Sequence, residues 1–447
     1  MIFMDKGANY EVKDINLAGQ GILNLEIAES RMQALMKVKE RFQAEKPLKG
    51  VRIGMALHVT KETGVLVRTL MAGGAEVAIT GCNPLSTQDD VASALAKEGI
   101  KVWAYKGETK EDYYRYLDYV IAFKPHITID DGCDLVSEIH KKHQHLIKDI
   151  IAGCEETTTG IIRLKALERD NALKYPMIAV NDNKTKHLLD NYIGTGESTW
   201  DGIKRGTNVL VSGRSVIVAG YGSCGKGVAL RAKGMGANVI VSGYGDCGKG
   251  VALRANGLGA RVIVTEVHPF RALQAFYDGY QVMKMDDAAK IGDIFITVTG
   301  NVGIIKINHI QNMKDGAIIC NSGHFDVEID YAGLKKIAKK VEEARPFVEK
   351  FTLSTGNRIL CLGQARLVNL SLAEGHPSEV MDTSFCGQAL ACEYAVKNKG
   401  KLPNKVIQLP EEIDDSIAEL KLEAYGVKID SLDKEQIKYL NSWEEGT

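Results

Sequence analysis

The stretch SVIVAGYGSCGKGVALRAKGMGANVIV, residues 215–241, decides the fold. Its β-branched start runs directly into a G-x-G-x-x-G loop made of Gly220, Gly222 and Gly225, and a helical segment and a second β-branched run follow. Glycines in such a loop let the backbone approach a pyrophosphate group, while the helix amino terminus supplies N–H donors and the positive end of its dipole. Strand, glycine loop, helix and strand in this order predict a dinucleotide-binding Rossmann unit.

This unit occurs twice in tandem, at 219–241 and 242–264. The copies differ at five of 23 aligned positions, namely Ala219/Ser242, Ser223/Asp246, Lys233/Asn256, Met235/Leu258 and Asn238/Arg261. A solenoid needs at least about three repeats. We therefore interpret the pair as a tandem βα duplication within one domain.

The dinucleotide fingerprint also needs an acidic residue about 20 positions on, which binds ribose hydroxyls. The second copy provides Glu266, 18 residues after Gly248, whereas the second strand of the first copy ends at Ser242. A carboxylate there, rather than an arginine cluster, favours NAD over NADP. We expect the complete pocket to consist of Gly243, Gly245, Asp246, Gly248 and Glu266. A mixed register, with Gly220, Gly222 and Gly225 in place and the insertion looped out, stays open.

A nucleoside-triphosphate loop is the competing interpretation, because G-x-x-x-x-G-K also fits residues 220–226 and 243–249. That motif continues with a Ser or Thr whose hydroxyl holds magnesium. Gly227 and Gly250 occupy this position here, and a glycine offers no ligand. The sequence therefore argues against a nucleoside triphosphatase.

Short β-branched runs alternate with longer helical patterns through most of the chain, which is typical of doubly wound α/β architecture. The expected buried strands are 51–57, 75–80, 101–106, 126–130 and 177–180, then 215–220, 261–266, 294–300 and 317–323. We predict two doubly wound parallel-sheet domains, linked by a helix within 190–214. The boundaries that we expect are a substrate-binding domain at 1–190 completed by 376–408, an inserted Rossmann domain at 191–375, and a helical arm at 409–447.

Composition excludes several classes of protein. The 56 Lys and Arg residues nearly cancel the 57 Asp and Glu residues, so no global field indicates a nucleic acid or an anionic membrane as partner. The start of the chain lacks the apolar core of a signal peptide, and no apolar run approaches the ~20 residues of a membrane helix. The nine cysteines contain no C-x-x-C pair. We expect a reduced, cytoplasmic protein.

Metal chemistry is not expected either. His140, His143 and His145 are closely spaced, but a charged surface explains them better, and the ligand pattern of catalytic zinc is missing. We predict no catalytic transition metal.

Polar residues cluster where the expected strands of the first series end. They are His58, Cys82, Asn83, Asp130, Asp131, Asn181 and Asp182. Ligands of open α/β sheets bind outside the carboxyl ends of the strands, so these residues should share one rim. Each of them alone could equally cap a helix or a turn. Their agreement across several strands favours a binding site.

Segments along nearly the whole chain resemble the S-adenosylhomocysteine hydrolase family. They are LHVTKET at 57–63, CNPLSTQDD at 82–90, IDDGCD at 129–134, CEETTTG at 154–160, KTKHLLDN at 184–191, TEVHP at 265–269, NSGHFDVEID at 321–330 and LVNLSLAEGHPSEVMD at 367–382. The compact tail ending YLNSWEEGT is similar to archaeal and thermophilic bacterial members. The duplication departs from the family, whose members usually carry one glycine loop, and this puts the NAD pocket in doubt.

The resemblance implies reversible hydrolysis of S-adenosylhomocysteine to adenosine and homocysteine. Transient oxidation of the ribose 3′-hydroxyl by NAD acidifies C4′, which allows thiol elimination, water addition and re-reduction. Lys186 and Asp190 match the family's pair at the 3′-hydroxyl; burial should lower the pKa of Lys186 while Asp190 opposes that shift. By residue spacing alone, this pair would be a surface ion pair. The remaining implied catalytic residues are Asp131 at C4′, His58 with His324 at the leaving sulfur, and Glu156 at the ribose hydroxyls.

The resemblance also implies binding residues and an assembly. Adenine would be contacted by Thr60 and Glu62, with His376 closing over it. The implied substrate residues are Thr60, Glu62, Gln88, His376 and Met381. The implied cofactor residues outside the glycine loops are Thr157, Thr158, Thr159, Asn191, Glu266, Arg271, Thr299, Gly300, Asn301 and Asn369. The implied partners are small molecules and further copies of the chain in a homotetramer.

Two alternatives remain open. Some methanogen relatives process S-inosylhomocysteine, although Glu62 can accept a hydrogen bond from an adenine amine that inosine lacks. The duplication could also disrupt the NAD site and leave a catalytically impaired relative that acts as a binding protein.

Overall fold

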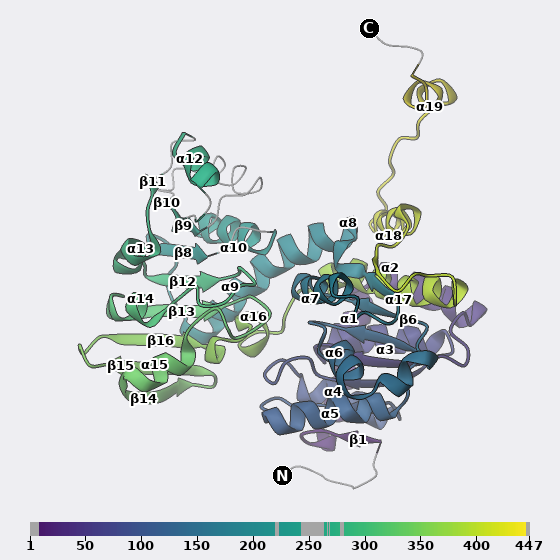
Figure 1. Cartoon of the computed structure of the whole chain (residues 1–447), viewed down its shortest axis with the longest axis horizontal. Coiled ribbons are helices and arrows are strands. Elements are labelled where there is room, and N and C mark those ends of the chain that lie inside the picture. Colours follow the sequence, from purple (N-terminus) through teal and green to yellow (C-terminus); the bar gives the residue numbers. More distant parts are fainter. Residues whose placement is uncertain are drawn as a thin grey trace.

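The computed structural model describes residues 9–219, 223–242, 263–265, 267, 269–277 and 281–443. Two sheets, each flanked by helices, form two α/β bodies joined by a long helical connection (Figure 1). Buried Ile53, Ile79 and Ile129 of the first sheet pack with the helices on one face, and Tyr116 and Leu164 belong to the core on the other. The α/β class predicted from the sequence is confirmed.

The first sheet is parallel throughout the described residues. Its order is β1-β4-β3-β2-β5-β6-β7-β17. The strands are β1 Tyr10–Glu11, β2 Arg52–Ala56, β3 Glu76–Thr80, β4 Lys101–Trp103, β5 Ile127–Asp130, β6 Ala152–Glu155, β7 Met177–Ala179 and β17 Val406–Ile407. Each run expected as a strand contains one. β6 was not expected, because AGCE has no β-branched residue.

Helices cover both faces of this sheet, which explains why its strands are nearly continuous apolar runs. They are α1 Ala18–Arg31, α2 Gln33–Glu45, α3 Lys61–Ala72, α4 Asp89–Lys97, α5 Lys110–Ala122, α6 Asp134–Lys142, α7 Thr158–Arg169 and α17 Ser378–Lys397. β17 lies beside β7, although it follows the whole second sheet in the sequence. The chain therefore returns to the first body near its end.

The second sheet is mixed, which corrects the prediction of a wholly parallel one. Its order is β11-β10-β9-β8-β12-β13-β16-β15-β14. The strands are β8 Ser215–Ala219, β9 Asn238–Ser242, β10 Ile263–Thr265, β11 Gln281–Val282, β12 Ile294–Thr297, β13 Ala317–Asn321, β14 Ala338–Arg345, β15 Val348–Leu353 and β16 Arg358–Leu362. β15 is antiparallel to both β14 and β16. Only short turns connect these three strands, whereas a parallel connection needs a crossover of a dozen or more residues.

The duplicated unit joins this sheet. β9, the second strand of the first copy, lies between β8 and β10 and is parallel to both. Ser242 is in register with Ala219 on one side and with Thr265 on the other. The first copy thus contributes a complete β8–α10–β9 unit, with α10 spanning Ser223–Gly234.

The connection between the bodies is helical, as predicted, but it begins earlier and changes pitch. α8 (Lys184–Lys186) continues into the π-helical segment η4 (His187–Gly194) and then α9 (Thr195–Thr207). Asn208, with a left-handed φ of 52°, caps the carboxyl end of α9. π-helical turns are rare and occur frequently at functional sites.

The remaining helices complete the second body and the carboxyl-terminal end. They are α12 Pro269–Tyr277, α13 Met285–Ile291, α14 Ile307–Gln311, α15 Tyr331–Ile337, α16 Val368–Ser371, α18 Glu411–Ala424 and α19 Lys434–Leu440. α18 packs beside α17, and α19 extends away from the body (Figure 1). Among the described helices, none has the length and apolar character needed to cross a bilayer.

α10 docks on the connecting helix through close backbone contact. A Cβ atom added at Gly227 would lie 1.8 Å from the carbonyl oxygen of Tyr192, and one added at Gly196 would lie 2.5 Å from the backbone of Gly227. Beside this contact, the Trp200 indole N–H donates to the carbonyl of Val228 at 2.8 Å. Among the described residues, the helix of the first copy therefore packs directly against the connecting helix.

Replacing Gly227 with alanine should destabilise the second body. The added methyl group cannot fit without separating α10 from η4, and overpacking of this kind costs about 1–3 kcal/mol. The matched control is Gly234→Ala in the same helix, where no atom lies within 4 Å of the added Cβ. Thermal denaturation should show a lower Tm for Gly227→Ala only; equal Tm values for both variants would contradict this docking.

Candidate active site between two topological switch points

The strand order of each sheet reverses at one point, and both points face the same cavity. In the first sheet the reversal lies between β2 and β5, and in the second between β8 and β12. Ligands of doubly wound sheets bind at such switch points. A cavity of about 1250 Å³ is lined by residues that follow these strands, including His58, Asp131, Ser223 and Thr299. Of the residues predicted to share a rim, His58 and Asp131 line this cavity, and Cys82, Asn83, Asp130, Asn181 and Asp182 are not in its lining.

Asp131 lies between two histidines from different bodies. Its Oδ2 is 3.5 Å from Nε2 of His58, and its Oδ1 is 3.5 Å from Nδ1 of His324, which follows β13. A Cβ added at Gly132 would lie 2.3 Å from the His324 ring, so the glycine admits this close approach. The site is therefore assembled only when the two bodies meet.

His58 is neutral at neutral pH. Burial lowers its pKa to about 4, with a further contribution from His324, while Asp131 opposes the shift. Nδ1 of His58 shares a hydrogen bond with the Ser86 hydroxyl at 2.7 Å. A neutral imidazole beside a carboxylate can accept a proton, which is the property that a general base needs.

The cavity also contains one group with metal-ligand spacing among the described residues. One ligand atom each of His58, Cys82 and Asp131 lie within 4.8 Å of one another. Burial raises the pKa of the Cys82 thiol well above its usual value, which disfavours the thiolate that binds metals.

His140, which the sequence analysis assigned to a charged surface, is instead buried. It is hydrogen-bonded to the Val136 carbonyl and stacked on Tyr175.

A buried ion pair lies on the connecting helix. Nζ of Lys186 is 3.2 Å from Oδ1 of Asp190 and 3.7 Å from Oε1 of Glu156, and all three side chains are buried. Asn181 and Asn191 accept further hydrogen bonds from the ammonium group. The two residues that the family resemblance pairs are thus in contact, and their burial rules out the surface ion pair that residue spacing alone predicted.

Burial and charge act in opposite directions on this pair. Burial lowers the pKa of Lys186, but Asp190, Glu156 and Asp131 outweigh it and raise the pKa above its usual value. For Asp190, burial acts to raise the pKa, but the charges of Lys186 and His376 hold it well below the usual range. In the free protein the pair is therefore an ammonium facing a carboxylate.

Glu156 is held by two side chains of α17, a helix far from it in the sequence. Its two carboxylate oxygens accept hydrogen bonds from Ser384 and Gln388, both on α17. Burial raises the pKa of Glu156 to about 7, and Asp190 adds to the shift while Lys186 and Ser384 oppose it. Helix α17, with which the chain returns to the first body, thus holds Glu156 in place, and this carboxyl group gains or loses its proton near neutral pH.

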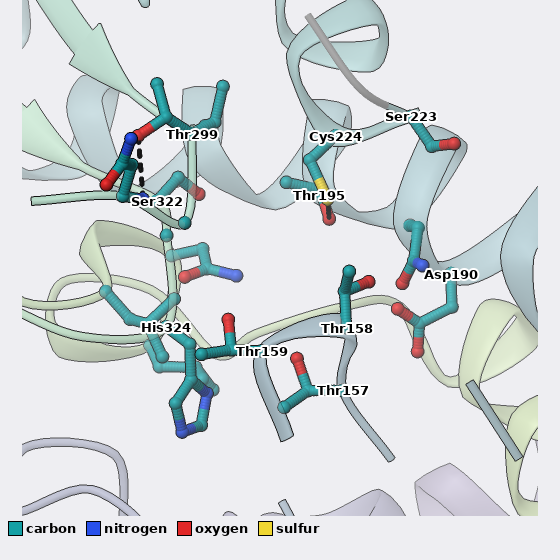
Figure 2. A pocket seen from close by; sticks show the side chains of 18 of the residues that line it. Thr157, Thr158, Thr159, Asp190, Thr195, Ser223, Cys224, Thr299, Ser322 and His324 are labelled. Atoms are coloured by element: carbon teal, nitrogen blue, oxygen red, sulfur yellow. Dashed lines mark hydrogen bonds between the residues drawn. The ribbon is translucent and has the colours of Figure 1, made fainter. Parts of the chain in front are cut away.

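Polar groups from both bodies face one another across the cavity. Thr157, Thr158 and Thr159, at the start of α7, lie opposite Cys224 and Thr195 (Figure 2). Asn369, also in the lining, is buried, and its Oδ1 has no hydrogen-bond partner. An orphaned acceptor costs free energy unless a ligand satisfies it. This side of the cavity therefore fits a polar ligand rich in donors.

The loop after β12 completes this wall. Glu328 accepts hydrogen bonds from the backbone N–H groups of Thr299 and Gly300, at 2.9 and 2.8 Å, and from the Thr299 hydroxyl at 2.7 Å. Gly300 has a φ of +67°, a conformation that glycine adopts without strain. Asn301 donates its N–H to the Thr299 hydroxyl. The loop is rigidly shaped around the cavity.

Most predicted site residues line the cavity. These are His58, Thr60, Glu62, Asp131, Glu156, Thr157, Thr158, Thr159, Lys186, Asp190, Asn191, Thr299, Gly300, Asn301, His324, Asn369, His376 and Met381. Gln88 is not in the lining; its amide accepts from the Lys61 N–H and donates to the Glu374 carbonyl. His376 contacts Asp190 and Ser198.

Several predicted cofactor residues lie outside the described residues. These are Gly220, Gly222, Gly243, Gly245, Asp246, Gly248 and Glu266, and the same holds for the side chain of Arg271 and for the surroundings of Gly225. Of the first copy, Ser223 and Cys224 line the cavity, and Thr265 at the end of β10 does so as well.

The sequence analysis did not predict that the two acidic residues of each doublet, Asp130-Asp131 and Glu155-Glu156, have different roles. Asp130 accepts the backbone N–H groups of Asp131 and Val136, and Glu155 accepts those of Gly132 and Thr157. Successive residues at the end of a strand point to opposite sides. The first acid of each doublet therefore shapes the turn, and the second, Asp131 or Glu156, faces the cavity. The two acidic pairs at strand ends, D-D and E-E, are the sequence pattern that could have indicated these two roles.

Sequence comparisons identify the family. The family model described as S-adenosyl-L-homocysteine hydrolase matches residues 9–150, and its NAD binding domain matches 191–242 and 235–375. The adenosylhomocysteinase of Sulfolobus acidocaldarius is 53% identical over 98% of this chain and 100% of its own. This chain belongs to the S-adenosyl-L-homocysteine hydrolase family. Its NAD-binding domain match indicates NAD as the cofactor.

Other members of the S-adenosyl-L-homocysteine hydrolase family are similarly close. The adenosylhomocysteinase of Aquifex aeolicus is 52% identical, and the S-inosyl-L-homocysteine hydrolase of Methanocaldococcus jannaschii is 54% identical, each over 98% of this chain and 100% of the relative. The two matches to the NAD binding domain overlap at 235–242, a range that contains β9.

Glu156 should make stability fall as the pH rises. Its pKa is raised from 4.5 to about 7, so its contribution is complete below pH 4.5 and is lost as the pH rises through 7. Linkage gives a loss of about 1.4 kcal/mol per pH unit in this window, about 3 kcal/mol in all. Glu156→Gln should flatten this part of the unfolding free energy measured against pH, and Glu26→Gln, on the exposed side of α1, should not. Parallel curves for wild type and Glu156→Gln would refute the assignment.

Proposed function

We propose that the chain reversibly hydrolyses S-adenosyl-L-homocysteine to adenosine and L-homocysteine with bound NAD. The observation that carries this is the convergence of Lys186 and Asp190, Glu156, and the His58–Asp131–His324 group on one cavity between two bodies. The family's conserved chemistry needs a ribose-oxidising half and a proton-transfer half within one enclosed site. The same convergence favours a hydrolase over the catalytically impaired relative.

The ribose hydroxyls are assigned to the buried ion pair and to Glu156. NAD, when bound, supplies oxidation of the ribose 3′-hydroxyl and its later re-reduction. Lys186 takes the hydroxyl proton, and Asp190 orients the ammonium group. Because the carboxylates raise the pKa of Lys186, the lysine must first pass its own proton to an acceptor, and Glu156, with Oε1 3.7 Å from Nζ and a pKa of about 7, can take it. A cationic ligand beside the lysine would lower its pKa and favour this transfer. Glu156 accepts hydrogen bonds from the ribose.

The remaining proton transfers are assigned to the group shared by both bodies. Asp131 serves the C4′ proton, because its carboxylate lies between the two imidazoles. His58 and His324 serve the leaving sulfur and the attacking water. The low pKa of His58 keeps it neutral and able to accept a proton at neutral pH. Closure of the two bodies would exclude bulk water from these steps.

The adenine base is assigned to the start of α3. Thr60 is the amino-terminal cap of this helix, and Glu62 is buried beside it. Oε1 of Glu62 accepts from the Ser378 hydroxyl at 2.6 Å and lies 3.3 Å from Nζ of Lys61. A carboxylate held in this way can accept a hydrogen bond from the exocyclic amine of adenine. Inosine is the second candidate, because the relative from Methanocaldococcus jannaschii is named an S-inosyl-L-homocysteine hydrolase.

The chain division proposed with this function assigns 1–190 and 376–408 to substrate, 191–375 to NAD and 409–447 to an arm. We propose a homotetramer in which the arm contacts a neighbouring copy. Large apolar side chains of the arm are exposed, among them Tyr425 at 60%, Ile429 at 72%, Leu440 at 67% and Trp443 at 92%. A protein surface rarely leaves so many apolar side chains together in water without a partner.

Thiol release from S-adenosyl-L-homocysteine, with excess NAD, tests the activity. Asp190→Ala should lower kcat at least about 100-fold, because it removes the group that orients Lys186. The matched control is Asp201→Ala, which removes a surface i,i+4 partner of Arg205 on the same connecting helix and should change kcat less than about twofold. If folded wild-type protein with excess NAD released no thiol, that result would contradict the proposal.

Base selectivity is tested by comparing two substrates. S-adenosyl-L-homocysteine should have a kcat/KM roughly 10- to 100-fold higher than S-inosyl-L-homocysteine, as expected for one hydrogen bond to a charged acceptor. Glu62→Gln should reduce this ratio, since an amide accepts more weakly and also offers a donor. A ratio near one in the wild type would contradict selectivity for adenine and keep S-inosyl-L-homocysteine as a candidate substrate.

A further inference from the structure

The side chain of Arg163 lies behind the active site, outside the described lining of the cavity. It projects from α7, and its Nη1 donates to the carbonyl oxygen of Gly132 and to Oδ1 of Asp134, the latter at 2.7 Å. Its Nη2 donates to the Ser137 hydroxyl at 3.2 Å. One guanidinium group thereby ties α7 to the turn that follows Asp131 and to the start of α6.

This turn has an unusual backbone. Gly132 has a φ of +108° and Cys133 a φ of +66°, so two successive residues have positive φ, and for Cys133 that conformation is strained. Strained backbone persists only where the surrounding structure holds it. Asp131 directly precedes the turn, and the His324 ring lies against Gly132. The hydrogen bond from Arg163 to the Gly132 carbonyl therefore fixes the backbone where the site needs the most accuracy.

The same guanidinium group also contacts the second body. Its Cζ lies 5.5 Å from the centroid of the Phe325 ring, which is within the range of a cation–π interaction. Phe325 follows His324, and the two rings meet edge to face with their centroids 4.7 Å apart. Arg163 thus contacts the backbone beside Asp131 and the ring beside His324, which come from different bodies.

Charge keeps the guanidinium group in this position. Burial acts to lower the pKa of Arg163, but the Asp134 carboxylate outweighs burial and raises the pKa above its usual value. Burial raises the pKa of Asp130 to about 7, and the Val136 N–H and the charge of Arg163 oppose that shift. Arg163 therefore also favours the ionised form of the carboxylate that accepts the N–H of Asp131.

We propose that Arg163 is a positioning residue that aligns Asp131 with His324 when the two bodies meet. The role rests on the proposed function, because it concerns the proton-transfer half of that reaction. A displacement of about 1 Å at a reacting group can lower a rate about 100-fold. The oxidation half is assigned to the Lys186 ion pair, whose described contacts do not include Arg163. Loss of the alignment should therefore slow thiol elimination and spare ribose oxidation.

Separate measurement of the two half-reactions, in the full-length chain with excess NAD, tests this. Arg163→Met keeps the apolar stem and removes the charge and the donors. It should slow thiol release roughly 10- to 100-fold, while NADH formation in a single turnover stays within about twofold of the wild type. Arg163→Lys should recover only part of the rate, because an ammonium group does not reproduce the planar fork of donors.

The matched control is Arg169→Met at the exposed end of the same helix. Arg169 pairs only with the neighbouring Asp170 among its described ion pairs, and its loss should change neither rate. If Arg163→Met slowed both half-reactions equally, the role would be merely structural, and that result would overturn the proposal.

A double-mutant cycle tests the contact between the bodies without any activity measurement. Phe325→Leu removes the ring face and keeps an apolar side chain. Because Arg163 and Phe325 contact each other, the Tm of the variant with both substitutions should fall by less than the sum of the two single shifts. Additive shifts in Tm would contradict the contact and reject the alignment.

These measurements distinguish the inference from the proposed function. Wild-type protein that neither reduces NAD nor releases thiol would reject the hydrolase, and the Tm cycle would still decide whether Arg163 joins the two bodies. Thiol release by the wild type that Arg163→Met does not slow would keep the hydrolase and reject the positioning role.

Discussion

The buried ammonium group of Lys186 is the interaction on which the active-site geometry depends. It lies within reach of Asp190 on its own helix and of Glu156 after β6, and Glu156 is in turn held by α17 from the far end of the chain. A buried charge without partners costs far more than its contacts return, so these groups have to remain together. One cation thereby ties the connecting helix, the first sheet and the returning carboxyl-terminal segment into a single arrangement.

The connecting helix can carry this network because its pitch changes. The π-helical segment η4 begins directly after Lys186 and contains Asp190 and Asn191, both of which contact the lysine. In a regular α-helix, residues four apart are neighbours but residues five apart point elsewhere. The wider turn brings Asn191 as well as Asp190 to the same ammonium group. Beyond η4, the close contact of Gly196 with Gly227 positions the second body.

The duplicated unit shows how far local pattern and global placement can diverge. Both copies satisfy every local requirement for a strand, a glycine loop and a helix, and 235–242 fits the family pattern in two registers. An added strand nevertheless moves the next strand outward by one full interstrand spacing, because backbone hydrogen bonds fix the distance between neighbouring strands. The duplication therefore widens the sheet by a whole strand, with β9 between β8 and β10.

The sequence by itself determined the α/β class, most of the strands and, with the family resemblance, most of the charged side chains at the centre of the cavity. β-branched runs, glycine spacing and strand-end polar residues are local properties of a chain, and His58, Asp131 and Glu156 could be found from them together with the family resemblance. It did not predict the antiparallel edge of the second sheet, the burial of His140 or the structural roles of Asp130 and Glu155. Only the tertiary structure decided these, and it also placed Ser223 and Cys224, at the start of α10, in the cavity lining. Each depends on which neighbour a segment packs against, and that neighbour is distant in the sequence.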